Sequence, residues 1–341
     1  MNKNPSKLGS ESSGSGGIST PNTVIFNNIE NIQQLLTAQE VEVRIAALSE
    51  ALKYGKTGID LVIISLQDES DQVQWKAYSI LQELEEAKVI EALSQYQWEA
   101  SKVLELYANG NRKFMRANLR DAELIEANLT GINLSFANLQ NANLRNTDLS
   151  AANLQNADLT DAYLSCCNLS QACLTGANFS NAFMWGVNLG NVNLSGIYLV
   201  DIGLSHANFN NSNLSEANLS YANLKSVNFS HANLSNINLK NANLSNVDLK
   251  QANLQNADLK DANLSGANLQ EANLKGANLR YTELWDANLS RANLFGADLS
   301  NANLESANLQ DANLENANFQ DANLENANLE GCKLPEKFSN F

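Results

Sequence analysis

The chain has 341 residues, of which 44% are hydrophobic and 17% are charged, so it has room for two or three structural units with apolar cores. Its formal net charge of −15 argues against general binding to nucleic acids or anionic membranes, because those polyanions attract surfaces rich in Lys and Arg. Residues 1–111 carry 8 basic and 15 acidic residues, and residues 112–341 carry 14 and 22, so the negative charge is spread along the chain.

The N-terminal residues 1–24 are rich in Ser, Gly, Asn and Pro. They bury too little apolar surface to offset the entropy lost on ordering, so we predict a disordered tail. The tail lacks the apolar segment of a secretory signal, and no stretch of the chain approaches 18 apolar residues, so we expect neither a signal nor a membrane span. The four cysteines, at 166, 167, 173 and 332, fit no metal-ligand spacing and no disulfide framework. We therefore expect a cytoplasmic protein.

Residues 25–108 have apolar residues at helical spacing, interrupted at Gly55, Gly58 and the acidic stretch 68–71. The segments 41–52 and 70–81 match at a spacing of 30 residues. The matched pairs are Val43 with Val73, Ala47 with Ala77 and Ser49 with Ser79. Paired helices of this kind resemble HEAT-like repeats, and we predict a small α-helical domain that caps the segment after it.

From residue 112 to residue 334 the sequence repeats every five residues, through 45 quintets without insertion or deletion. The centre of each quintet is nearly always Leu. Two residues earlier, at what we call the small position, stands Ala in most quintets. Between them is the Asn position, held by Asn or Asp, and after the centre come two variable corner positions. This period of five fits neither a helix nor a simple strand.

Such a chain can turn a corner after every quintet, so that four sides close one coil of 20 residues. The centre and the small position then point inward, and coils stack through main-chain hydrogen bonds at about 4.8 Å. About 11 coils make a rod on the order of 50 Å long. Residues 20 apart lie in one column. One coil alone buries too few side chains to offset its own ordering, so only the stack is stable.

The A-(N/D)-L-x-x array resembles the pentapeptide-repeat family over residues 112–334. That resemblance implies a right-handed quadrilateral parallel β-helix. The predicted fold class is α+β multidomain, with this solenoid of about 11 coils preceded by the helical domain at 25–108. We expect residues 335–341 to be a C-terminal tail or a small cap.

The array offers little chemistry, because a regular rod has no insertions from which to build a concave site. His206 and His231 lie on different corners without Cys or His partners in their columns, and no phosphate-binding or Cys-x-x-Cys motif occurs. We therefore expect no enzyme activity, no cofactor and no metal.

One outward face differs from the Asn-rich surface. Eight Asn positions after residue 117 carry another residue, and five of them, at 123, 163, 183, 203 and 283, share a column. Trp185 and Trp285 share the next corner column, and Tyr221 and Tyr281 share the adjoining one. Exposed aromatic residues are typical of interfaces because they offer large contact area. We call this set the aromatic face and predict that it binds protein: Tyr163, Phe183, Trp185, Tyr221, Tyr281 and Trp285.

Three functions follow for the array. The first is a protein-binding scaffold or regulatory protein with a rigid rod, whose partner and oligomeric state the sequence does not name. The resemblance implies two others: regulation of cell differentiation in photosynthetic bacteria, and DNA mimicry toward a type II topoisomerase such as gyrase. Mimicry fits less well, because the array carries only −8 and its middle contains the basic column Lys240, Lys260 and Arg280. Direct contact with nucleic acid is not expected.

Overall fold

The computed structural model describes residues 28–335. The predicted tail at 1–24 and residues 336–341 of the predicted C-terminal segment lie outside the described residues. The chain divides into two compact units, one up to Ala77 and one from Tyr78 onward, and each is described by itself.

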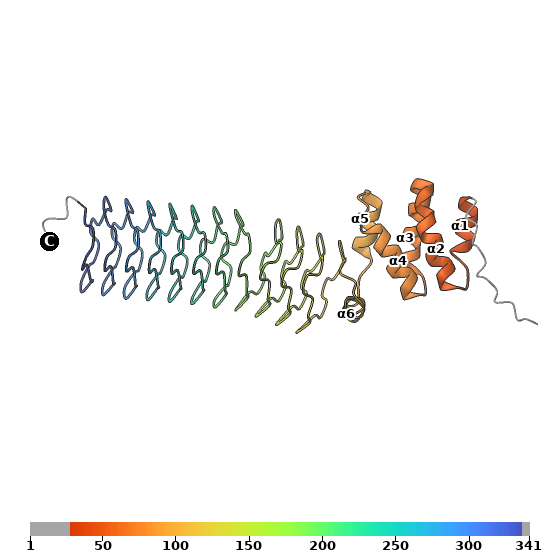
Figure 1. Cartoon of the computed structure of the whole chain (residues 1–341), viewed down its shortest axis with the longest axis horizontal. Helices are drawn as coiled ribbons and strands as arrows, with labels where there is room; N and C mark the ends of the chain where they lie inside the picture. Colours follow the sequence, from red (N-terminus) through yellow and green to blue (C-terminus); the bar gives the residue numbers. More distant parts are fainter. Residues whose placement is uncertain (1–27, 336–341) are drawn as a thin grey trace, which may run out of the picture. The chain divides into compact units, whose positions relative to one another are not determined.

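The first unit is helical (Figure 1). In chain order its elements are α1 (Ile29–Leu35), α2 (Val41–Ala51), the short 3-10 helix η1 (Leu52–Tyr54), α3 (Gly55–Ile64), the 3-10 helix η2 (Ser65–Gln67) and α4 (Asp71–Leu81), whose last residues belong to the second unit.

The apolar stripes of these helices form the core of the first unit. Ala47 and Leu48 of α2, Val62 of α3 and Val73 of α4 are fully buried. The helices predicted from the 30-residue match are thereby confirmed as α2 and α4. The buried Arg44 donates to the carbonyl of Ala38 at 2.6 Å and pairs with Asp68 at 3.1 Å, so its charge is compensated.

The second unit begins with the end of α4 and continues through α5 (Ala87–Gln95) and α6 (Ala100–Ala108). The segment after α5 pairs with the first coil, where the Trp98 amide donates to the Asn118 carbonyl at 2.9 Å. The Trp98 ring meets Phe114, the first central residue, edge-to-face at 6.2 Å, and the Tyr78 hydroxyl donates to the Met115 carbonyl at 2.6 Å. Residues 78–98 thus cover apolar side chains at the start of the array.

The array itself is a stack of 20-residue coils (Figure 1). Asn positions pair in parallel with those 20 residues later, from Lys113 with Asn133 to Asn313 with Lys333, except at three positions between residues 173 and 203. On a regular side the Leu244 amide donates to the Asn263 carbonyl at 2.7 Å, and the Asn263 amide donates to the Ala242 carbonyl at 3.0 Å. The predicted parallel stacking is therefore present.

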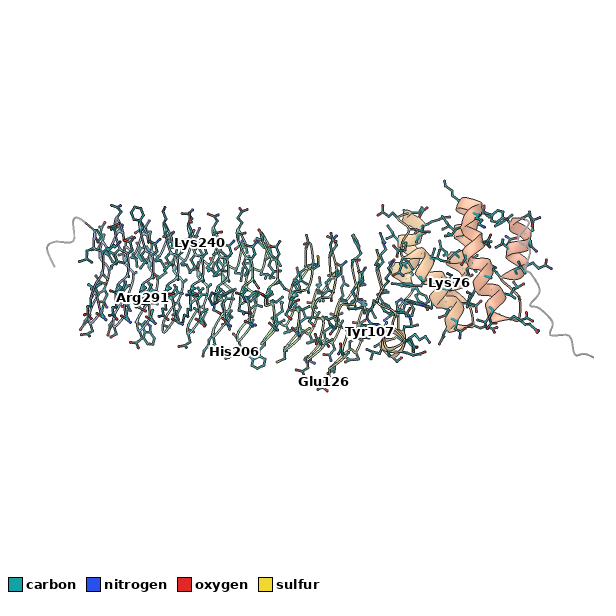
Figure 2. All side chains as sticks on the ribbon, in the orientation of Figure 1. Lys76, Tyr107, Glu126, His206, Lys240 and Arg291 are labelled. Carbon is teal, nitrogen blue, oxygen red and sulfur yellow. The ribbon has the colours of Figure 1, made fainter. Side chains whose placement is uncertain are left out.

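The interior is layered as the repeat predicts. Central Leu side chains such as Leu244 and Leu254 are fully buried, and Ala residues at the small position are 0–1% exposed through most of the array. The other side chains project outward, among them His206, Lys240 and Arg291 (Figure 2).

Each corner is a tight turn with a left-handed residue. The amide of the small position donates to the centre three residues earlier, for example Val247 to Leu244 at 3.2 Å. The second corner position has a positive φ at every quintet from Arg116 to Gly331. Asn, Asp and Gly tolerate this conformation best, and no β-branched residue occupies it in this range.

Asn side chains add a second set of bonds between coils. The Asn233 amide group donates to Asn213 at 2.9 Å, and Asn253 donates to Asn233 at 3.0 Å in the same column. The same Asn oxygen also accepts the main-chain amide two residues later, as in Asn233 with Ser235 at 3.3 Å. This double role explains why Asn or Asp fills this position.

The stacking opens at one place, which the repeat did not predict. On three of the four sides, the bonds between residues 172–184 and residues 192–204 are absent from the described structure. We call this interval the open seam. The amides that lack the bond made elsewhere in the array are those of Leu174, Gly176, Phe179, Asn181 and Met184 on one lip, and those of Asn193, Tyr198 and Gly203 on the other. The fourth side stays closed, with the Leu169 amide bonded to Asn188 at 2.7 Å.

We attribute the open seam to overpacking of the core. The coil above it has β-branched residues at all four small positions, which no other coil of the array has: Val187, Val192, Ile197 and Ile202. The coil with Val227 and Ile237 alternates them with Ala and stays fully paired. Added methyl groups in a filled core force the surrounding backbone apart, at a typical cost of about 1–3 kcal/mol.

Candidate protein-binding face

The aromatic face lies on the side of the coil that carries Tyr163 and Phe183 in its column of Asn positions. These two rings stack in parallel, with centroids 5.0 Å apart and planes 5° apart. The Arg145 guanidinium lies 4.4 Å from the centroid of the Tyr163 ring, on the coil below. Tyr163 is therefore half-buried, whereas Phe183 is 54% exposed. Gly203, next in the column, has no side chain to cover Phe183.

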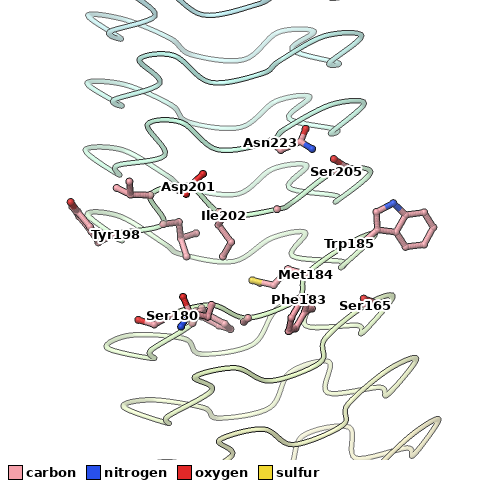
Figure 3. A pocket seen from close by; sticks show the side chains of 16 residues that line it. Ser165, Ser180, Phe183, Met184, Trp185, Tyr198, Asp201, Ile202, Ser205 and Asn223 are labelled. Carbon is pink, nitrogen blue, oxygen red and sulfur yellow. The ribbon is translucent and has the colours of Figure 1, made fainter.

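Trp185 is 54% exposed at the corner next to Phe183. Its ring meets His206 of the following coil, with centroids 5.6 Å apart. Phe183 and Trp185 line one cleft, together with Met184 and Ile202 (Figure 3). Because Tyr163 stacks on Phe183, the structure brings three of the predicted residues together: Tyr163, Phe183 and Trp185.

Tyr221 lies apart from this group, two coils beyond Phe183 along the array, and is 61% exposed. Its φ is +62°, in the left-handed region that bulky residues rarely adopt. Tyr281 has the same conformation, with a φ of +59°. Aromatic side chains thus stand where the local backbone favours Asn, and strain of this kind is common at functional sites.

Tyr281 and Trp285 form a second group, each 46% exposed on one side of a single coil. Five coils separate Trp285 from Trp185, which corresponds to about 24 Å at the usual strand spacing. A small hollow beside Trp285 is lined by Asp286 and Glu305. The predicted face is therefore two aromatic groups with Tyr221 between them.

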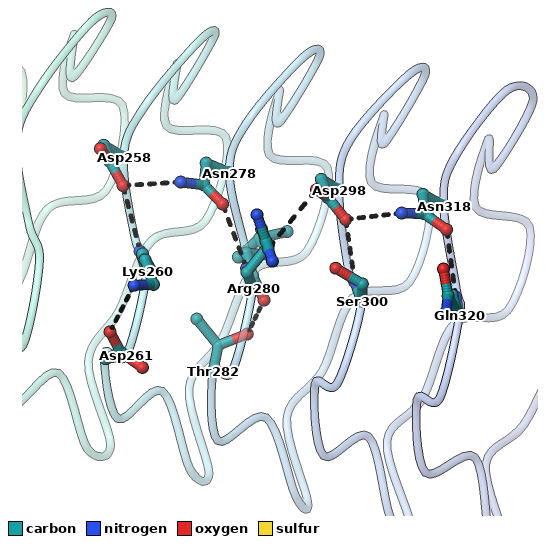
Figure 4. A network of polar contacts seen from close by, with 11 residues as sticks. Asp258, Lys260, Asp261, Asn278, Arg280, Thr282, Asp298, Ser300, Asn318 and Gln320 are labelled. Carbon is teal, nitrogen blue, oxygen red and sulfur yellow. Dashed lines mark hydrogen bonds and ion pairs between the residues drawn. The ribbon is translucent and has the colours of Figure 1, made fainter.

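The basic column borders the second group. Figure 4 shows Lys260 and Arg280 of this column with the carboxylates that they pair with. Lys260 and Arg280 lie 5.8 Å and 5.7 Å from the centroid of the Tyr281 ring. Arg280 also pairs with Asp298 at 3.8 Å, and Lys260 with Asp261 at 3.5 Å. These exposed ion pairs contribute little stability, below about 1 kcal/mol each, but they neutralise charge beside the aromatic rings.

Lys240 continues the basic column and pairs with Asp258 at 2.8 Å. The hydrogen bond and the charge of Asp258 raise the pKa of Lys240 above its ordinary value. The lysine therefore stays charged at neutral pH, and its charge is matched by a carboxylate on the next coil.

Sequence reasoning missed two exposed aromatic residues. Tyr198 is 74% exposed and lines the same cleft as Phe183. Tyr198 stands at an Asn position on the adjacent side of the coil, outside the column of Tyr163 and Phe183. Phe136 is 48% exposed at a different corner, where Arg116 lies 5.2 Å from its ring centroid.

Within residues 28–335, no three His, Cys, Asp or Glu side chains gather as metal ligands would. No helix in that range combines the length and the apolarity needed to cross a membrane.

Family models of two kinds match the array. The model described as pentapeptide repeat region matches residues 202–279. The model described as pentapeptide repeats (8 copies) matches residues 113–150, 142–181, 157–196 and 297–334. No curated protein matches the chain.

Solved structures of similar proteins carry the same repeat. HetL, a pentapeptide repeat protein involved in heterocyst differentiation regulation from the cyanobacterium Nostoc sp. strain PCC 7120, is 37% identical over 70% of this chain and 98% of its own, with a TM-score of 0.45. The pentapeptide repeat protein alr5209 from Nostoc PCC 7120 is 40% identical over 26% of this chain and 80% of its own, with a TM-score of 0.17.

QnrB1, a plasmid-mediated fluoroquinolone resistance protein, is 17% identical over 67% of this chain and 92% of its own, with a TM-score of 0.33. The family is shown by the matched models and by the identity to HetL, which extends over nearly all of that protein. This chain belongs to the pentapeptide-repeat family.

Proposed function

We propose that the protein is a non-enzymatic, cytoplasmic scaffold that binds a partner protein through the aromatic face of a right-handed β-helix. The observation that carries this proposal is the exposure of Phe183, Trp185, Tyr221, Tyr281 and Trp285, which is 46–61%, on one side of the rod. Large aromatic side chains held on a rigid support lose little entropy on binding, so they are favourable anchors for a partner.

The strained corners support the same proposal. A left-handed φ at Tyr221 and Tyr281 disfavours a bulky residue, and Asn at the equivalent corners is the easier choice. A residue that lowers stability and is exposed gives no benefit to the fold itself. Its benefit in our proposal lies in contact with a partner.

The charges favour a scaffold over DNA mimicry. A duplex presents one negative charge per about 1.7 Å without interruption. Beside the aromatic face, three basic residues in one column pair with Asp258, Asp261 and Asp298, so the acidic charge there is interrupted.

A second candidate role is regulation of cell differentiation, and the observation that favours it is the 37% identity to HetL. This role is compatible with the scaffold, because a protein-binding rod can regulate a process through the partner that it binds. The regulatory role would specify which kind of partner the scaffold binds, and it would not require an enzymatic reaction.

Quantitative capture of partners from the native cell tests the proposal. We expect Trp185→Ala combined with Trp285→Ala to lose the partner that the full-length protein captures, because the two anchors of the face are removed. The matched control is Phe136→Ala, which removes an exposed aromatic side chain from another corner and should leave capture intact. Equal capture by the double variant and the wild type would refute the proposed face.

A further inference from the structure

The open seam exposes main-chain hydrogen-bonding groups in the middle of the array. Among residues 172–204, five amides on one lip and three on the other lack the partners that their equivalents have elsewhere in the described array. A row of free amides and carbonyls along extended backbone is what an added strand pairs with. The seam is thus an internal edge, whereas edges otherwise occur only at the ends of a β-helix.

A cleft of about 690 Å³ lies along this edge (Figure 3). The buried Met184 and Ile202 and the exposed Phe183 line it. Trp185 and Tyr198 project outward at its two ends. A second cleft of about 430 Å³ continues around the corner and shares Phe179 and Tyr198 with the first. Volumes in this range accommodate a drug-sized ligand or a short peptide segment.

Gly203 keeps the first cleft open. It stands at an Asn position directly after Phe183 in the column, and a Cβ added to it would meet no atom within 4 Å. The absence of a side chain is therefore not required by crowding or by a left-handed φ. It leaves the space beside Phe183 unfilled.

The charge around the seam is uniformly negative. No Lys or Arg occurs between Arg145 and Lys225, whereas five acidic residues do: Asp148, Asp158, Asp161, Asp201 and Glu216. Asp201 lines the cleft itself. The exposed rings of Trp185 and Tyr198 also attract cations through their faces. The seam is therefore complementary to a basic ligand.

We propose that the open seam binds an extended, basic peptide segment of a partner protein, which adds to the exposed edge as a β-strand. The main-chain groups of the lips pair with the peptide backbone, apolar side chains of the peptide enter the cleft beside Phe183 and Met184, and its Lys or Arg residues lie near Asp201. The inference deepens the proposed function and rests on it, since it specifies the form in which the scaffold receives a partner.

The probe is a short synthetic peptide of alternating Val and Lys, labelled with a fluorophore and titrated with the full-length protein by fluorescence anisotropy. Two altered peptides separate the contribution of main-chain pairing from that of the positive charges. One has N-methyl groups on alternate amides, so that it cannot pair along its edge, and the other has Glu in place of Lys. We expect each change to weaken binding by about tenfold or more.

A closed-seam variant tests the site. Replacing Val187, Val192, Ile197 and Ile202 with Ala restores the ordinary repeat, and we expect the coils to pair and peptide binding to fall by about tenfold or more. The matched control places the same four changes, two Val→Ala and two Ile→Ala, at regular small positions: Ile132, Val227, Ile237 and Val247. This control should keep peptide binding.

Two further measurements guard against a variant that simply unfolds. Gly203→Asn places the usual side chain into the cleft without a backbone conflict, and it should also weaken peptide binding by about tenfold or more. Amide hydrogen exchange at Leu174, Phe179 and Met184 should be fast in the wild type and slow in the closed-seam variant. Retained fast exchange in that variant would contradict our account of why the seam opens.

The outcomes separate this inference from the proposed function. Three results would overturn the seam as a strand-binding edge. One is that the N-methylated peptide binds as tightly as the original peptide, and another is that the original peptide binds the Gly203→Asn variant as tightly as the wild type. The third result is that the original peptide does not bind the wild type. These results leave the test with Trp185 and Trp285 unaffected, because that test uses the native partner. Loss of the native partner from the double Trp variant, together with a failed peptide titration, would retain the face and reject the seam.

Discussion

Replacement of Tyr221 by Asn isolates the energetic role of the left-handed corner. Tyr221 has a φ of +62°, and its equivalents one coil before and after, Asp201 and Asn241, have φ values of +58° and +57°. The backbone is therefore the same while the side chain differs. The Tyr221 side chain is 61% exposed, so its replacement removes little packing. We expect Tyr221→Asn to stabilise the array.

The magnitude follows from the cost of a Cβ-bearing residue in this region, which is about 1–2 kcal/mol for most residues and smaller for Asn. A gain of about 0.5–1 kcal/mol is expected for Tyr221→Asn, after the loss of some ring contact. Tyr221→Val should instead destabilise by about 1 kcal/mol or more, because a β-branched residue conflicts most with this backbone. In a unit of this size, 1 kcal/mol shifts the unfolding midpoint by about 2–4 °C.

Thermal unfolding of the three proteins gives the order of stability. Hydrogen exchange at residues 219–224 gives the local change, which is needed because long repeat arrays do not always unfold as one cooperative unit. We expect Tyr221→Asn to be the most stable protein, the wild type to be intermediate and Tyr221→Val to be the least stable. Equal stability of the Asn and Val variants would refute the argument that the corner conformation selects its residues. A stabilised Asn variant that also loses the native partner would show that stability was given up for binding.

Three other perturbations test the fold. Leu254→Ala should cost about 2–5 kcal/mol in denaturant unfolding because Leu254 is fully buried, whereas Leu334→Ala, at a side chain 43% exposed, should cost less than about 1 kcal/mol. Hydrogen bonds from Ser150, followed by those from Asn168, hold the pKa of Asp148 below its ordinary value despite partial burial. That carboxylate therefore stabilises the fold above its unfolded pKa, and the contribution is lost as the pH falls through its lower folded pKa, so Asp148→Asn should flatten the acid limb of a stability–pH curve below about pH 4. A maleimide followed by mass spectrometry should label the exposed Cys166 and spare Cys167, since burial raises the pKa of the Cys167 thiol; equal labelling of both would contradict the assigned coil register.

The regular part of the structure could be predicted because it repeats. The period of five places Leu254 inside and Asn253 on the ladder without knowledge of any distant contact, and the pairing of Asn position with Asn position follows from the 20-residue coil. The helices α2 and α4 were predictable for a similar reason, since Val43 and Val73 repeat at fixed spacing.

The irregular part could not be predicted in the same way. The four β-branched residues from Val187 to Ile202 are visible in the sequence, but their effect depends on how much volume the coil below can accept. The coil with Val227 and Ile237 shows that two such residues are tolerated. Tyr198 lies on the adjacent side of the coil, and the five-residue period gives no indication that it lines the same cleft as Phe183. The start of the second unit at Tyr78 depends on contacts such as Tyr78 with Met115, which no local pattern indicates.

Hydroxyl-radical footprinting of the full-length protein, free and bound to its captured partner, tests the central claim most directly. The proposed face predicts that oxidation of Trp185, Tyr221, Tyr281 and Trp285 falls on binding, while oxidation of Phe136 on another corner is unchanged. Protection of Phe136 with unaltered oxidation of the four aromatic-face residues would contradict the account, because the partner would then occupy a different side of the rod.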